Sequence, residues 1–91
     1  MDVRITAKGK KVSRRFQERI KQKLISLTRY SKRLHFVDVI IEKFKDRDRV
    51  SFKMGVAQQP FAMVQADGPT ANTAFQMALQ KAGGRLRKMR P

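Results

Sequence analysis

The chain has 91 residues, and its 22 lysines and arginines against 7 acidic residues give it a net charge of +15. So much like charge on one small domain repels itself, which predicts a polyanionic partner such as nucleic acid. A hydrophobic content of 41% is too high for a disordered basic tail, and the absence of cysteine excludes disulfides, thiolate metal sites and cysteine nucleophiles.

The first third of the chain predicts a strand followed by a helix. Side chains alternate between apolar and polar over residues 2–7, as in a strand with one covered face. Ser13 fits the N-cap of a helix that should fade near Tyr30. The apolar residues of this helix recur every three or four positions and form one stripe: Phe16, Ile20, Leu24 and Leu27.

Three strands are predicted in the middle of the chain, over residues 34–45, 50–56 and 61–66. β-branched and aromatic residues are frequent there, and apolar residues alternate with polar ones. The links between the strands are short turns, one of them charged and one containing proline. Consecutive strands with short links imply an antiparallel meander.

A second amphipathic helix is predicted from residue 71 to residue 89, with Thr70 as its N-cap. Its apolar side consists of Ala71, Phe75, Ala78, Leu79, Ala82, Leu86 and Met89. Gly83 and Gly84 lie inside this helix, and each costs about 0.5–1 kcal/mol relative to alanine. We therefore expect a weak point or bend there, with helix on both sides. One flank carries three basic residues at spacings of four and three: Lys81, Arg85 and Lys88.

The order of these elements is β-α-β-β-β-α. It predicts an α+β two-layer sandwich in which both helices cover one face of a four-stranded sheet, with residues 1–91 as a single domain. The outer helix surfaces would form adjoining basic ridges with a groove between them, a shape that suits an RNA phosphate backbone. A solvated basic face that only aids solubility is the alternative. The charge excess is nevertheless far beyond the magnitude of about 2–8 that is usual for a small soluble domain.

Membrane association is a weaker alternative. The apolar stripes of both helices are needed for the core, which leaves no second apolar face for lipid. No apolar run approaches the roughly 20 residues that cross a bilayer, and the N-terminal residues lack the apolar run of a signal peptide. We therefore expect a cytoplasmic protein without a membrane partner.

Two phenylalanines, Phe36 and Phe44, fall on the sheet face opposite the core residues of their strand. Exposed there, they would stack on bases as in sheet-based RNA readers, or else pack against a partner or cover the sheet edge. The aromatic-glycine signature of an RRM does not accompany them, which favours packing.

The sequence gives little support for enzymatic chemistry. The only histidine, His35, lies at the entry of a strand and is interpreted as a surface or edge residue. Asp46 and Asp48 flank Arg47 in a turn and are expected to pair with it. None of the familiar zinc, phosphate-loop or serine-nucleophile motifs is present. We expect no enzyme, no catalytic residues, no metal, no cofactor and no small-molecule substrate.

Three stretches of the sequence are similar to parts of one known family. They are the first helix with its exit RYSKRL at residues 29–34, the strand VDVIIE at residues 37–42, and the closing helix at residues 74–88. In this order they resemble the ribosome hibernation-promoting factor family, also called protein Y or ribosome-associated inhibitor, in its short form or as its N-terminal domain. The glycine pair at residues 83–84 departs from the acidic-basic pair of that family.

The resemblance implies a fold like that of a double-stranded-RNA-binding domain. It implies a translation inhibitor, monomeric off the ribosome, that binds the small ribosomal subunit and its rRNA in the mRNA/tRNA channel and keeps ribosomes inactive in stress or stationary phase. Tyr30 would close the first helix onto the sheet. The implied RNA-binding residues are Lys23, Arg29, Arg33, Lys81, Arg85, Arg87, Lys88 and Arg90. A general double-stranded-RNA-binding module and an integral ribosomal protein are the alternatives.

Overall fold

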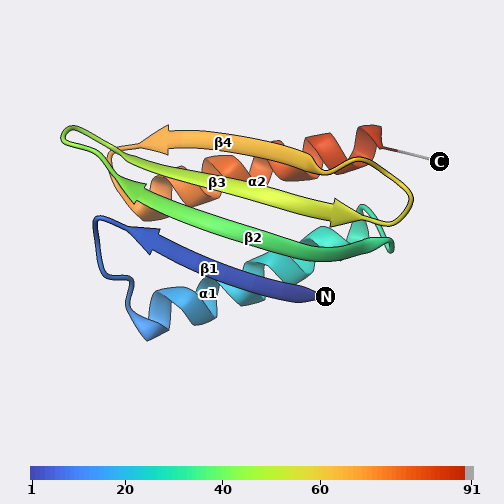
Figure 1. Cartoon of the computed structure of the whole chain (residues 1–91), viewed down its shortest axis with the longest axis horizontal. Coiled ribbons are helices and arrows are strands. Elements are labelled where there is room, and N and C mark those ends of the chain that lie inside the picture. Colours follow the sequence, from blue (N-terminus) through green and yellow to red (C-terminus); the bar gives the residue numbers. More distant parts are fainter. Residues whose placement is uncertain (90–91) are drawn as a thin grey trace.

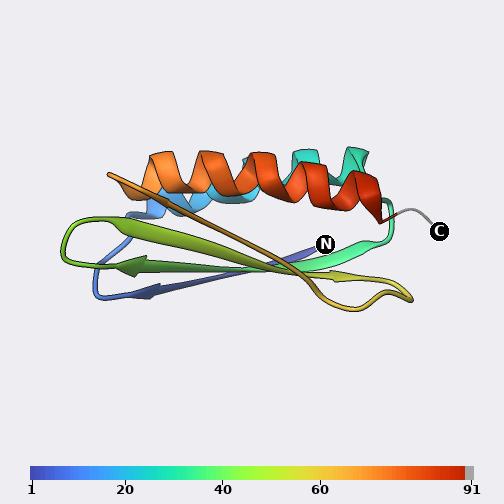
Figure 2. The same cartoon turned by 90° about the horizontal axis from the view of Figure 1, so that it is seen from above.

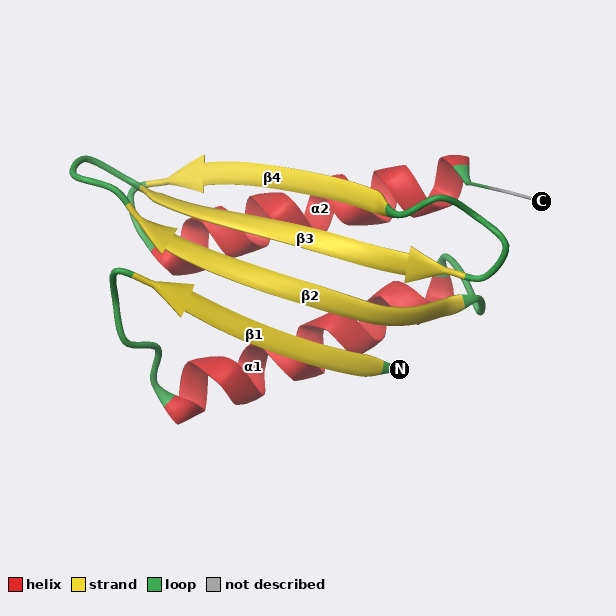
Figure 3. Ribbon diagram, in the orientation of Figure 1, coloured by secondary structure: helices red, strands yellow, loops and turns green. Residues whose placement is uncertain are grey.

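The computed structural model describes residues 1–89, and these form a sheet covered on one face by two helices. The elements are β1 (Asp2–Lys8), α1 (Arg14–Ile25), the 3-10 helix η1 (Ser26–Arg29), β2 (Leu34–Lys43), β3 (Asp48–Val56), β4 (Ala62–Gly68) and α2 (Ala71–Lys88). α1 lies behind β1 and β2, and α2 lies behind β3 and β4 (Figures 1 and 3). The view from above shows both helices in one layer and the strands in the other (Figure 2). The predicted order and the α+β two-layer sandwich are therefore confirmed.

The four strands follow the order β1-β2-β3-β4 across the sheet. β2, β3 and β4 pair antiparallel through short turns, so the predicted meander is confirmed. β1 pairs parallel with β2, and such a pair needs a long crossover connection, which α1 and η1 supply. Each strand begins and ends within two residues of its predicted bounds.

The core lies between the sheet and the helices. Ile20 and Leu24 of α1 are completely buried, and Phe75 of α2 is 1% exposed. The Phe75 ring meets the Phe16 ring edge-on with centroids 6.3 Å apart, and its centroid lies 5.7 Å from that of Phe52 in β3. Aromatic pairs of this kind add about 0.5–1.5 kcal/mol beyond the area they bury. The three rings therefore join both helices to the sheet.

Both helices begin at the predicted N-caps. The Ser13 hydroxyl accepts a hydrogen bond from the backbone N–H of Phe16 at 3.1 Å, and the Thr70 hydroxyl accepts one from Thr73 at 3.2 Å. These bonds satisfy amide groups that have no partner inside the helix. The first helix was expected to fade near Tyr30, and it does so by tightening into η1 after Ile25.

α2 continues through Gly83 and Gly84 as one α-helix, so the helix expected on both sides of the pair is confirmed and no break separates them. Packing explains the glycine at position 83, because a Cβ there would lie 3.1 Å from Cε2 of Tyr30. Tyr30 was expected to close the first helix onto the sheet. Its ring instead lies against Gly83 of α2, since η1 carries the chain toward the C-terminal end of that helix.

Gly84 has no comparable neighbour, and this difference gives a stability prediction. A Cβ at Gly84 would come no closer than 4.0 Å to the atoms around it. Gly84→Ala should raise the free energy of unfolding by about 0.5–1 kcal/mol, and Tm by about 2–8 °C, because alanine loses less backbone entropy in a helix. Thermal denaturation followed by circular dichroism measures this. A Tm at or below that of the wild type would contradict the continuous helix.

Candidate nucleic-acid interface

Basic and acidic residues are distributed unevenly between the two layers. The helix layer, residues 14–33 and 71–88, carries twelve basic residues and a single acid, Glu18. Such a density of like charge is unfavourable for the free protein and is relieved when a polyanion lies against it. Most of the net charge of +15 therefore belongs to the helix side of the molecule.

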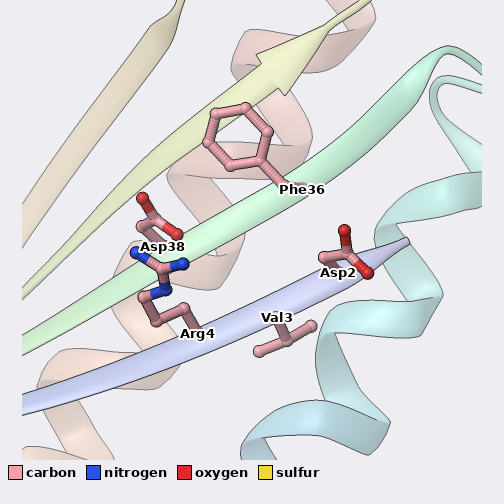
Figure 4. Close-up of a pocket in the computed structure, with 5 residues that line it drawn as sticks. All are labelled: Asp2, Val3, Arg4, Phe36 and Asp38. Atoms are coloured by element: carbon pink, nitrogen blue, oxygen red, sulfur yellow. The ribbon is translucent and has the colours of Figure 1, made fainter.

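The open face of the sheet has balanced charges instead. Strand register places basic and acidic residues side by side in two cross-strand rows: Arg4, Asp38 and Lys53 in one, and Lys8, Glu42, Arg49 and Asp67 in the other. Figure 4 shows the side chains of Arg4 and Asp38 next to each other, at a hollow of about 430 Å³ that Phe36 also lines. Opposite charges on neighbouring strands attract one another by about 0.2–1 kcal/mol per pair. This face therefore offers a polyanion little net attraction.

The Phe36 ring on this face packs within the chain. Its centroid lies 5.9 Å from that of Phe61, and the two rings meet edge-on. A Cβ at Gly55 would lie 2.0 Å from Cε1 of Phe36, so only glycine leaves room for the ring at that position of β3. The packing interpretation of Phe36 is therefore favoured over base stacking.

The Phe44 ring is occupied by cations of the chain itself. The guanidinium groups of Arg47 and Arg49 lie over it, 4.8 and 4.9 Å from its centroid. Both arginines also donate to the carboxylate of Asp67, at 2.9 Å from Arg47 Nε and 2.8 Å from Arg49 Nε. The ring therefore serves as a platform for these arginines at the turn between β2 and β3. These are the two central strands, so Phe44 does not cover an edge of the sheet as the alternative interpretation expected.

The same cluster gives a prediction for acid pH. The hydrogen bond from Arg49, and next to it that from Arg47, holds the pKa of Asp67 below its usual value. A carboxyl whose pKa is lower in the folded state stabilises the fold above its unfolded pKa, and that stabilisation is lost as pH falls through the folded pKa. Arg49→Gln should raise the pKa of Asp67 toward its usual value and weaken the acid dependence of stability below about pH 4. An NMR titration of the Asp67 carboxyl measures this, and an unchanged pKa would contradict the assigned cause.

Asp48 was expected to pair with Arg47, and this expectation is wrong. Asp48 is 4% exposed, and its Oδ2 accepts from Lys10 Nζ at 3.0 Å, while Lys43 Nζ lies 3.9 Å from its Oδ1. Strand alternation explains the difference, because Asp48 is the first residue of β3 and points to the inner side of the sheet. Asp46, which precedes the strand, does pair with Arg47 at 2.8 Å.

A groove runs between the two helices, and its middle section is a hollow of about 280 Å³. Arg19 and Lys23 line it from α1. Three amide side chains at intervals of four residues line it from α2: Asn72, Gln76 and Gln80. The predicted groove is present, with Lys23 inside it, and its two walls differ in chemistry. One wall offers cations to phosphate, and the other offers amides that donate and accept hydrogen bonds.

The basic row of Lys81, Arg85 and Lys88 does not border this groove. The ammonium group of Lys81 donates to the backbone carbonyl of Gln65 at 2.8 Å, and Gln65 belongs to β4, the outer strand on this side of the sheet. Helical spacing places Arg85 and Lys88 on the same flank as Lys81. The expectation that this ridge adjoins the first helix is therefore wrong. The row follows the outer edge of the molecule because the amide flank of α2 is the one that faces α1.

Three other predicted residues belong to the segments where the two helices end, and these segments lie at the same end of the molecule (Figure 1). Arg29 is the last residue of η1, and Arg33 lies just before β2; both are exposed. The Arg87 guanidinium lies 5.3 Å from the centroid of the Tyr30 ring, which joins the end of α2 to the end of η1. The remaining predicted residue, Arg90, lies outside the described residues.

Arg19 and the amides of α2 were missed as candidate site residues. Arg19 lies four residues before Lys23, and this spacing alone would have placed both on one flank of α1. The amides carry no charge, so a prediction based on charged residues does not include them. Their common spacing of four was the available signal.

Residues 1–89 hold neither a cluster of metal-ligating side chains nor a helix that could span a membrane. In that part of the chain, no three acidic or histidine side chains come together in a way that would hold a metal ion. None of the helices described there has the length and the apolar character that crossing a membrane requires.

Comparison with known proteins identifies similar chains. A family model described as sigma 54 modulation protein / S30EA ribosomal protein matches residues 3–90. The fold is similar to that of a ribosomal subunit interface protein from Coxiella burnetii, with a TM-score of 0.85 and 18% identity over 97% of this chain and 96% of that one. It is also similar to the N-terminal domain of Thermus thermophilus Protein Y, with a TM-score of 0.87 and 13% identity over 99% and 100% of the two chains. A search of curated proteins finds no significant match.

Proposed function

The chain belongs to the family of sigma 54 modulation proteins and S30EA ribosomal proteins, and from this premise we propose that it binds the small ribosomal subunit and inhibits translation. The observation that carries the proposal is the separation of charge, with twelve basic residues and one acid in the helix layer and balanced rows on the open sheet face. The names of the two structural neighbours, a ribosomal subunit interface protein and a Protein Y domain, agree with it.

The proposed mechanism is occupancy of the mRNA/tRNA channel. The helix face lies against rRNA phosphates, and each cation that neutralises a phosphate releases counterions, which supplies the affinity. Lys23 lies in the groove, Lys81, Arg85 and Lys88 follow the outer flank of α2, and Arg29, Arg33 and Arg87 lie where the helices end. Because the protein acts by filling the channel, it needs neither a catalytic group nor a cofactor. Ribosomes held in this way stay inactive in stress or stationary phase.

Sedimentation with purified ribosomal subunits tests the proposal. We expect the protein to sediment with the small subunit, to be displaced by mRNA and tRNA together, and to inhibit translation in vitro at one copy per ribosome. Equal affinity for a random RNA duplex would point instead to a general double-stranded-RNA-binding module. Binding to the large subunit alone would contradict the proposal.

Washing the complex with salt separates the proposed factor from an integral ribosomal protein. For an interface of six to ten phosphate contacts, affinity should fall roughly 10³- to 10⁵-fold between 50 and 200 mM salt, so the protein should leave the subunit. Retention on subunits after a high-salt wash would indicate permanent incorporation.

A further inference from the structure

A second hollow, of about 470 Å³, lies where η1 meets the C-terminal part of α2. Its lining includes Ser26, Tyr30, Leu79, Gln80, Gly83 and Arg87. The hollow lies between η1 and the C-terminal part of α2, and Arg87 is the basic residue that lines it. Its volume falls within the range of about 300–1,000 Å³ that is typical of sites for small ligands.

Tyr30 gives this hollow an aromatic wall. Tyr30 is 38% exposed, although its ring packs against Gly83. A Cβ added at Gly83 would lie only 3.1 Å from Cε2 of this ring. Gly83 therefore lets the Tyr30 ring approach α2 more closely than a residue with a Cβ would allow. Leu79 adds an apolar surface to the same space.

The rim of the hollow is polar and basic. The Arg87 guanidinium lies over the Tyr30 ring, 5.3 Å from its centroid. Gln80 brings an amide with both donors and acceptors, and Ser26 brings a hydroxyl whose proton is donated to the carbonyl of Lys23 at 2.6 Å. An aromatic face, a guanidinium plane and an amide are the groups that hold a splayed-out RNA base by stacking and by hydrogen bonds to its edges.

We propose that this hollow takes one unstacked base of a single-stranded RNA segment. The base stacks on the Tyr30 ring, the exposed Arg87 side chain moves to cover its other face, and Gln80 bonds its edge. This inference rests on the proposed function, since it names the kind of RNA that the helix face binds. Duplex RNA keeps its bases stacked and paired, so it has no base to offer. Free phosphate gains nothing from Tyr30 and Leu79.

The composition of the chain allows a direct test, because Tyr30 is its only tyrosine and it contains no tryptophan. In protein labelled at tyrosine, the ring signals seen by NMR therefore report on this hollow alone. We expect a single-stranded RNA hexamer to shift the Tyr30 ring signals upfield through the ring current of the stacked base. Inorganic polyphosphate of matched charge, which binds the basic surface but has no bases, should leave them almost unchanged. Equal shifts with both polyanions, or none with the hexamer, would overturn the proposal.

Substitutions test the same site through the affinity of each variant for a labelled RNA hexamer, which fluorescence anisotropy measures. Tyr30→Phe keeps the ring and should bind as the wild type does, whereas Tyr30→Leu should lose roughly 5- to 100-fold. Gly83→Ala pushes the ring into the hollow and should weaken hexamer binding several-fold. Its matched control, Gly84→Ala, makes the same change one position later and should leave the affinity unchanged. Circular dichroism confirms that each variant is folded.

The outcomes separate this inference from the proposed function. Wild-type protein that binds small subunits, combined with full hexamer affinity in Tyr30→Leu, would overturn the base site and leave ribosome binding intact. Preference for an RNA duplex over the hexamer would overturn it as well. If the hexamer shifts the Tyr30 ring signals but the protein does not sediment with small subunits, the proposed function is contradicted and the base-binding site is supported.

Discussion

Changing Lys23, Arg85 and Lys88 together to glutamine is expected to weaken binding to the small ribosomal subunit roughly 100-fold at physiological salt. All three side chains are exposed in the helix layer. The slope of log K against log salt should also become less steep by about one for each lost phosphate contact. The slope of the triple variant should therefore be less steep than that of the wild type by about three. Lys81 is left in place, because its ammonium group holds the carbonyl of Gln65 and its loss would disturb the edge of the sheet.

A matched triple variant on the open sheet face is the control. Arg4, Lys8 and Lys53 changed to glutamine remove the same total charge from the face with balanced rows. This variant should lose only the few-fold affinity that long-range attraction supplies. Equal losses in the two variants would mean that net charge alone drives binding, and a larger loss in the control would assign the interface to the sheet.

The second large effect concerns the core. Phe75→Ala is expected to lower the free energy of unfolding by about 3–5 kcal/mol, because it leaves a cavity among buried rings. Phe75 is 1% exposed and touches both Phe16 and Phe52. A domain of this size has a total stability of about 5–15 kcal/mol, so the substitution should remove a large fraction of it. Urea denaturation followed by circular dichroism gives the value.

Phe61→Ala provides the comparison for this loss. Phe61 is 59% exposed, and its ring contacts are the Phe36 edge and Lys53 Nζ, 4.3 Å from its centroid. Its removal should cost about 1 kcal/mol or less. A loss for Phe75→Ala no larger than that for Phe61→Ala would contradict the description of the three-ring core.

Local sequence patterns were sufficient for the architecture. The change from alternation in residues 2–7 to the spacing of Phe16, Ile20 and Leu24 marks the passage from strand to helix. The hydroxyls of Ser13 and Thr70 fix where the helices begin. Each of these signals depends on neighbours within four residues, so no tertiary information is needed to interpret it.

Contacts between distant segments were not accessible in the same way. Which flank of α2 faces α1 depends on how the helix rotates over the sheet, and helical spacing alone does not fix that rotation. The outer position of Lys81 and the amide wall of the groove follow from it. Likewise, Asp48 pairs with Lys10, 38 residues away, although Arg47 is its neighbour in sequence.

The charge separation between the two layers could be predicted only in part from the sequence. The acid-poor helices were visible in the sequence, but the balance on the open face depends on strand register. That register places Asp38 and Glu42 of β2 between basic residues of β1 and β3. Composition predicted a polyanionic partner, and the register indicates which face is free to meet it.

Lysine acetylation of the protein, alone and bound to small ribosomal subunits, tests the central assignment of the helix layer most directly. Mass spectrometry then reports how far binding protects each lysine. We expect strong protection of Lys23 and Lys88 on the helix side, and continued modification of Lys8 and Lys53 on the open sheet face. Protection of Lys8 and Lys53 with free reaction of the helix lysines would contradict the assignment.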